Sequence, residues 1–390
     1  MRIPILLIGL LVAAAIQPAM AQSPLEIEFD VETVAVISPL AKDEGATDSE
    51  GLLAELSLET QAEKVLDNGV RLRARSVLRA QRDHPARPGG SAGFGTDQLA
   101  TSGGFSGLSS GPTLDQNDIR ARFETAYFQI DGGYGEVRIG KDQGVAARFH
   151  EGAKSVLSHA RLDSTLLDPS GLSVIRTRHD LTGPSLKFSY ATPRIVGLRA
   201  GISITPEANA DGLDRRPGHG SGATLPDMES AVELALNGSH LFRDSGWRVE
   251  AALAWSGADM SAYDPLTQTD RIETWSAGTR LSQGDWTFGA SWLGSDNGLL
   301  NGDYEAWSAG LARTAWATDF SFDYGEVRDD GALIDSSGWR LGAARSFGKG
   351  QTIALAYRRD DLSNPQHSWD SQGIVVEITL SSEIHKLTVN

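Results

Sequence analysis

Arginine recurs along the segment 69–80 at spacings that place several guanidinium groups on one side of an extended chain. These residues are Arg71, Arg73, Arg75 and Arg79, and the positions between them are mostly apolar. Side chains at every second position share one face of a β-strand. A row of like charges cannot lie unpaired in a dry protein core. It can, however, line a water-filled passage and act on the solutes that pass.

Two later segments extend this row. The segment 118–131 carries Arg120 and Arg122 on its polar side, and the segment 135–141 carries Arg138. Strands that follow one another in the chain are usually neighbours in a sheet. We therefore predict that these seven arginines form one pore-lining surface, called here the basic wall. The alternative is an arginine stripe on an exposed strand of a soluble protein.

The connection 142–184 supplies candidate partners for the basic wall. Connections of this length are usually functional or disordered. This one contains the acids Glu151, Asp163 and Asp168. We expect these three carboxylates to oppose the basic wall, so that a transverse field acts on solutes in the narrow section.

Signals for enzymatic chemistry are weak. The stretch 107–111 matches G-x-S-x-G, but it lies in a Gly/Ser-rich region rather than between a strand and a helix. The eight histidines are scattered, and the chain has no cysteine. No zinc signature, dinucleotide fingerprint or P-loop is present. We predict no enzymatic activity, no metal site and no cofactor, and the net charge of −16 argues against nucleic acid as a partner.

The N-terminus has the features of an export signal. Arg2 precedes the apolar run 3–16, and Ala19-Met20-Ala21 forms a small-x-small cleavage site. We therefore predict a signal peptide over 1–21 and a mature domain over 22–390. The alternative is an N-terminal anchor, but the apolar run is shorter than the ~20 residues that a spanning helix needs.

Sixteen segments of the chain alternate between apolar and polar positions, which is typical of half-buried strands. They are 25–37, 51–60, 69–80, 118–131, 135–141, 185–192, 197–205, 228–241, 246–256, 271–282, 285–295, 303–313, 316–326, 337–347, 351–360 and 369–380. Short connections between these segments alternate along the chain with connections that are mostly longer. This asymmetry and the even number favour an all-β transmembrane antiparallel barrel with short periplasmic turns and long outer loops.

Aromatic residues recur eight positions apart on three of these segments. The pairs are Trp247 and Trp255, Trp316 and Tyr324, and Trp339 and Phe347. Eight residues span ~27 Å along a strand, which a tilt reduces to a height close to the ~25 Å apolar band of outer-membrane barrels. We predict that the six residues belong to the aromatic girdles. Aromatic residues that simply cap the strands of a soluble β protein are the alternative.

The stretch Gly135–Lys141, followed by a long acidic loop, resembles the segment that leads into the constriction loop of Gram-negative general porins. The resemblance implies a sixteen-stranded outer-membrane barrel with 142–184 folded into the lumen, and a homotrimer embedded in outer-membrane lipid. The chain departs from the family at its end, because residues 381–390 follow the last expected strand and no aromatic residue closes it.

We therefore predict an outer-membrane porin for passive diffusion of small hydrophilic solutes and ions. One alternative is a channel selective for anions or sugars that uses the arginines as binding sites. A secreted β-sandwich or propeller that binds ligands is another, and a barrel enzyme of the outer membrane is the third.

Overall fold

A computed structural model describes residues 23–44, 49–84, 102–108, 119–164, 166–208, 227–261 and 265–389. The predicted signal peptide, 1–21, lies outside these residues. Within them the only helix is the single turn α2, Val145–Arg148. Among the described residues, no helix has the length and apolar character needed to cross a bilayer.

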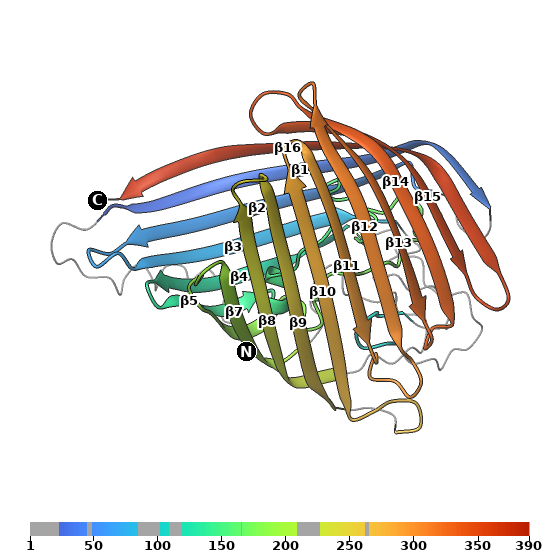
Figure 1. The fold of residues 1–390 in the computed structure, drawn as a ribbon, viewed down its shortest axis with the longest axis horizontal. Coiled ribbons are helices and arrows are strands. Elements are labelled where there is room, and N and C mark those ends of the chain that lie inside the picture. Colours follow the sequence, from blue (N-terminus) through green and yellow to red (C-terminus); the bar gives the residue numbers. More distant parts are fainter. Residues whose placement is uncertain are drawn as a thin grey trace.

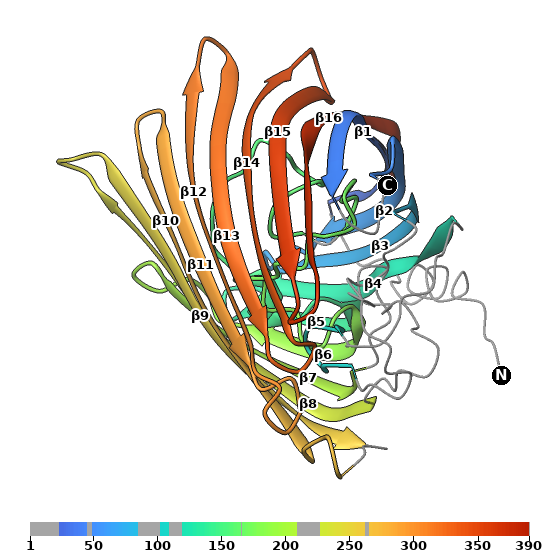
Figure 2. The ribbon, with the colours of Figure 1, turned by 90° about the vertical axis from the view of Figure 1, so that its right-hand side faces the viewer.

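Sixteen antiparallel strands form one closed barrel in which each strand pairs with its neighbours in the chain, and β1 pairs with β16 (Figures 1 and 2). The strands are β1 Leu25–Glu44, β2 Leu52–Val65, β3 Arg71–Arg82, β4 Arg120–Gly132, β5 Gly135–Asp142, β6 Ser185–Ala191, β7 Leu198–Glu207, β8 Asp227–Phe242, β9 Trp247–Ser261, β10 Arg271–Gln283, β11 Trp286–Ser295, β12 Tyr304–Ala315, β13 Thr318–Asp329, β14 Ile334–Ser346, β15 Gln351–Ser363 and β16 Ser368–Val389. The predicted all-β antiparallel barrel and all sixteen predicted strands are confirmed.

The first and last strands are longer than their alternation predicts. They pair from Leu25↔Val389 to Glu44↔Asp370, so the residues after 380 continue β16. Two bulges, at Phe29/Asp30 and Ile37/Leu40, interrupt this register. Such bulges change which face a side chain occupies, which explains why β1 lacks a simple apolar and polar alternation.

The two faces of the wall differ in composition. On β9, Leu253 is 59% exposed whereas its neighbour Ala254 is 8% exposed, and Trp247 shares the outer face with Leu253. Apolar side chains thus cover the outside of the barrel, where hydrocarbon replaces water. The opposite face carries small, polar and charged side chains.

A bulge on β4 changes one expected assignment. Val77 pairs with Thr125 whereas Leu78 pairs with Phe123, so Glu124 is the extra residue. Strict alternation would place Tyr127 on the same face as Phe123. The bulge instead turns Tyr127 inward, where the Arg138 guanidinium lies 4.6 Å from the centre of its ring.

Trp316 lies in a turn and not in the strand predicted over 316–326. Trp316 and Ala317 have φ values of 51° and 56° and connect β12 to β13. Two consecutive left-handed residues match the twist of the flanking strands, as in a type I′ hairpin turn. The Trp316 side chain is 87% exposed.

Toward the end of the chain the outer loops are no longer than the short turns. The connections 330–333, 347–350 and 364–367 are equally short. The reason is that β13 ends at Asp329, β14 begins at Ile334 and β15 ends at Ser363, each three residues beyond the predicted strand, and these added residues shorten the outer loops.

The orientation of the β9 side chains predicts the outcome of a charge substitution. Leu253→Arg should destabilise the folded barrel in lipid vesicles by about 2 kcal/mol, because it places a guanidinium on the hydrocarbon side. Denaturant titration of the free energy of folding measures this loss. Ser57→Arg is the matched control, since Ser57 lies opposite Glu32 on the inner face beside an open cavity of about 610 Å³. Equal losses in the two variants would contradict the assigned faces.

Candidate functional site: the inner wall and the loop it holds

The connection between β5 and β6, of which residues 143–164 and 166–184 are described, lies inside the barrel. Its backbone N–H groups donate to Ser203 of β7 at Val145, to Ser321 of β13 at Val156, and to Glu377 of β16 at Ala160. A single segment that touches strands so far apart around a closed ring must run through the interior of that ring. Figure 2 shows this part of the chain within the curve of the strands. This segment is called the inner loop below.

Glycines on the inner face allow the inner loop to approach the wall closely. A Cβ added at Gly278 of β10 would lie 1.9 Å from the Glu151 carbonyl oxygen. One added at Gly289 of β11 would lie 2.4 Å from the carbonyl oxygen of Gly152. Real side chains cannot occupy such positions, so these glycines let the two backbones touch. Gly310 of β12 and Gly342 of β14 continue the contact, against Ala153 and Val156, respectively.

Apolar side chains of the inner loop find apolar partners on the inner face. Leu157 and Leu167 are buried with Val34, Val36 and Leu53 of β1 and β2. A second cluster joins other inner-loop residues to strands on the far side of the barrel: Leu162, Leu172, Val174, Ile175 and Leu181 with Ile272, Leu293, Tyr304 and Val327. Full burial of each large aliphatic side chain is worth about 1.5–3 kcal/mol relative to exposure, so the inner loop is part of the packed structure.

The four β3 arginines of the basic wall face inward, and each contacts a glutamate of β2. Arg73 lies 2.7 Å from Glu63. Arg75 approaches Glu59 through two nitrogens, at 2.5 and 2.8 Å. Two further pairs complete the ladder, Arg71 with Glu63 at 3.1 Å and Arg79 with Glu55 at 3.1 Å. Sequence reasoning missed these glutamates, although their four-residue spacing on β2 placed them all on one face of a strand next to β3.

The remaining arginines of the basic wall lie on β4 and β5. Arg120 is 3.5 Å from Asp83, and Arg122 lies opposite Arg79 in the register of β3 and β4. Arg138 contacts Glu136 at 2.9 Å and Asp142 at 2.8 Å.

Two more arginines, which sequence reasoning did not single out, join the β5 group. Arg148 of α2 and Arg199 of β7 both contact Glu136. The guanidinium groups of Arg138, Arg148 and Arg199 therefore surround the carboxylates of Glu136 and Asp142.

The three inner-loop acids have partners outside the basic wall. Glu151 lies 3.1 Å from Arg280 of β10, and Asp163 lies 2.8 Å from Arg161 within the inner loop itself. Burial alone would raise the pKa of Asp163, but the Arg161 guanidinium holds it below its usual range. These pairings differ from the predicted opposition, because β2 already brings carboxylates within reach of the β3 arginines.

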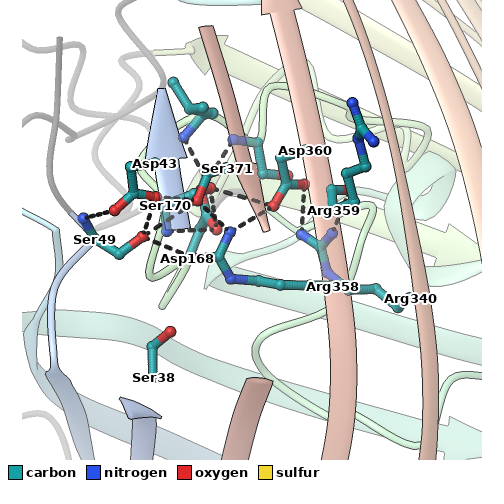
Figure 3. A network of polar contacts seen from close by, with 12 residues as sticks. Ser38, Asp43, Ser49, Asp168, Ser170, Arg340, Arg358, Arg359, Asp360 and Ser371 are labelled. Atoms are coloured by element: carbon teal, nitrogen blue, oxygen red, sulfur yellow. Dashed lines mark hydrogen bonds and ion pairs between the residues drawn. The ribbon is translucent and has the colours of Figure 1, made fainter. Parts of the chain in front are cut away.

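Asp168 belongs to a buried polar network near the outer loops (Figure 3). Its carboxylate accepts hydrogen bonds from the Ser170 hydroxyl at 2.8 Å and the Ser173 backbone N–H at 2.9 Å. The Ser170 hydroxyl also lies 3.3 Å from Asp360 of β15. This contact ties the returning part of the inner loop to the wall.

Two arginines complete this network. Asp360 lies 2.7 Å from Arg340 and 3.1 Å from Arg358. Arg358 also donates to Ser371 of β16 at 2.9 Å and to Ser49 of the first outer loop at 2.8 Å. Buried charges are tolerated when they are paired with opposite charges, and removing one partner is strongly destabilising.

His159 anchors the turn of the inner loop to three strands. Its ring nitrogens lie 3.5 Å from Glu32 of β1, 3.7 Å from Glu377 of β16 and 4.0 Å from Glu55 of β2. Burial alone would lower the pKa of His159, but hydrogen bonds to Glu32 and Glu377 raise it to about 9. The imidazole is therefore protonated at neutral pH.

Aromatic residues form two rows on the outside. Trp255, Tyr324 and Trp339 lie toward the outer loops, with ring contacts to Trp275 at 6.3 Å, Trp307 at 5.4 Å and Tyr357 at 5.3 Å, respectively. Trp247, Trp316 and Phe347 lie at the short turns. Sequence reasoning missed the partner rings because each strand was considered alone.

The residues described include no group of three or more histidine, aspartate and glutamate side chains arranged to hold a metal ion. A profile of Gram-negative porins matches residues 9–365. The chain belongs to the Gram-negative porin family. No curated protein sequence matches it.

Solved porin structures share the fold of this porin at low sequence identity. OmpF of Salmonella typhi has a TM-score of 0.58 at 13% identity, over 92% of this chain and 98% of that chain. The anion-selective porin from Comamonas acidovorans has a TM-score of 0.56 at 12% identity, over 93% and 99%. The trimer form of OmpT from Vibrio cholerae has a TM-score of 0.55 at 12% identity, over 92% and 99%. With the family match, these findings identify an outer-membrane channel for passive diffusion.

The close contact at Gly278 predicts that its substitution displaces the inner loop. Gly278→Ala should destabilise the folded porin by about 1–3 kcal/mol, because the new methyl group overlaps the Glu151 carbonyl oxygen and one backbone must move. Thermal unfolding measures the loss. Gly51→Ala is the control, since a Cβ there meets no atom within 4 Å. An unchanged Gly278→Ala protein would show that the inner loop does not rest on this wall.

The charge on His159 predicts a pH dependence. Because the pKa of His159 is raised, its ion pairs contribute fully below its ordinary pKa of about 6.5 and are lost as pH rises through about 9. We expect up to about 3 kcal/mol of stability to disappear over this range. Thermal unfolding at pH 7 and pH 10 measures it. His159→Gln should be less stable at pH 7 and lose less on alkalinisation, and equal pH dependence in both proteins would refute the role.

Proposed function

We propose that this porin conducts small hydrophilic solutes and ions through a water-filled lumen that the inner loop narrows. The observation that carries the proposal is the exposure of charged side chains inside a closed barrel. Arg71 is 47% exposed, Arg75 37% and Arg79 30%, although all three point away from lipid. Guanidinium groups in that position require water beside them, and continuous water through a barrel is a path for solutes.

The inner loop sets the width of this path. It is anchored at α2, at Gly278 and Gly289, at His159 and at Asp168, so it is fixed around most of the ring. Solutes pass between its free face and the basic wall, driven by their own gradients. The arginines of the basic wall on β3 and β5 are engaged in ion pairs with carboxylates, and this arrangement supports a channel without a catalytic cycle.

We also propose that the porin assembles as a homotrimer through the outer face of β2 and β3. The aromatic rows cover β9 to β15, where rings suit the lipid interface. In contrast, β2 and β3 contain no aromatic residue, yet Leu56 and Leu58 are about 40% exposed on their outer side. An apolar face without interfacial rings suits contact with another subunit. The OmpT structure described as a trimer supports the same assembly.

Planar-bilayer recording tests the proposal. The purified porin should insert with ohmic conductance, and high voltage should close each inserted unit in three equal steps. Ser158→Trp should lower the conductance of each step, because Ser158 is exposed on the free face of the inner loop. Ser245→Trp, in the exposed turn 243–246, is the control. Membranes that stay silent after verified insertion would contradict a pore, and a single closing step would contradict the trimer.

A further inference from the structure

The free face of the inner loop carries a lysine that the wall holds in place from both sides. Ala153, before it, is buried against the position of Gly310. Ser155, after it, donates a hydrogen bond from its hydroxyl to Asp323 of β13 at 2.7 Å. Lys154 itself is exposed. Since the inner loop lies inside the barrel, an exposed side chain between two wall-bound neighbours points into the lumen.

Arg178 has the same arrangement on the returning part of the inner loop. Thr177 accepts a hydrogen bond from Ser291 at 2.8 Å. His179 contacts Ser276 at 2.9 Å and Ser256 at 2.6 Å. Thr177 and His179 are fully buried, whereas Arg178 between them is exposed. The strand contacts of its neighbours therefore direct this guanidinium into the lumen as well.

The nearest acids of the inner loop do not neutralise these two cations. Glu151 is paired with Arg280, and Asp163 is paired with Arg161. Within the described part of the chain, neither Lys154 nor Arg178 lies within 4 Å of a carboxylate oxygen. Burial lowers the pKa of His150 to about 4, so His150 adds no charge at neutral pH.

The cations and carboxylates of the wall across the lumen are close to balanced. The four β3 arginines of the basic wall contact three glutamates of β2. The group around Glu136 and Asp142 contains three arginines. Glu32 and Glu377 beside His159 offset the small surplus of arginines in these two groups, and Arg120 is paired with Asp83. Among the described residues, Lys154 and Arg178 therefore add positive charge to an otherwise nearly balanced section of the lumen, in a chain whose formal charge is −16.

We infer that Lys154 and Arg178 form an anion-recognition position in the narrow section, and that this porin selects small inorganic and carboxylate anions over cations. Ammonium and guanidinium groups without carboxylate partners attract anions from water and form charge-assisted hydrogen bonds with them. Rings and walls of one charge set the selectivity of pores in this way. The inference rests on the proposed function, because it requires a conducting lumen, and it concerns which ions that lumen prefers.

The reversal potential across a KCl gradient tests the inference. The wild-type porin should pass chloride in preference to potassium. Lys154→Gln and Arg178→Gln should each lower the chloride-to-potassium permeability ratio about sevenfold, because one unit charge roughly 7 Å from a passing ion in water favours chloride and disfavours potassium by about threefold each. Charge-preserving variants, Lys154→Arg and Arg178→Lys, should retain the wild-type ratio.

A matched control distinguishes an effect of the position of the charge in the lumen from an effect of the net charge of the protein. Arg243→Gln removes one positive charge from the exposed short turn 243–246 and should leave the ratio unchanged. Potassium preference in the wild type, or equal shifts in the control and inner-loop variants, would overturn the inference while leaving the pore intact. Absence of any conductance after verified insertion would overturn the proposed function instead. Circular dichroism of each variant confirms that the barrel has folded.

Discussion

The pairing of β1 with β16 is the contact on which the rest of the structure depends. Inside a bilayer no water is available for backbone N–H and C=O groups, so every strand needs a partner on both sides. An open sheet would leave two edges unpaired. These two strands form the longest pair in the barrel and tolerate two bulges along it, which shows that continuous pairing outweighs a regular alternation of faces.

Closure has a second effect, because it creates an interior in which side chains must suit either water or the inner loop. Glycine occurs where the loop backbone rests on the wall, at Gly278 and Gly289. Valine and leucine occur where loop leucines pack, at Val34 and Leu53. Arginine and glutamate occur where neither covers the wall. One surface thus changes chemical character within a few residues of each strand.

Alternation and turn signals were sufficient to predict the number of strands, their order and the face of most side chains. The bulge at Glu124 could not be predicted, because an extra residue leaves no local pattern and turns Tyr127 to the other face. The ends of β1 and β16 were missed because each strand stabilises residues of the other that have weak strand patterns alone. Pattern reasoning works for local periodicity and fails where a distant segment supplies the partner.

The ion pairs of the basic wall show the same limit, because their partners come from other strands. The inward orientation of Arg73 and Arg75 followed from spacing, but their partners depended on which strand lay alongside. Glu59 and Glu63 belong to a segment whose acids stood next to apolar residues in a pattern typical of any amphipathic strand. The positions of Lys154 and Arg178 depend on contacts of their neighbours with five different strands, which no local sequence pattern encodes.

The register of the first and last strands also governs how the protein is made. Residues 25–44 must wait for residues 370–389 before either can complete its hydrogen bonds. Contacts between such distant parts of a chain are the slowest to form. Until these two strands pair, their edges lack hydrogen-bond partners, and unpaired strand edges favour association with other chains.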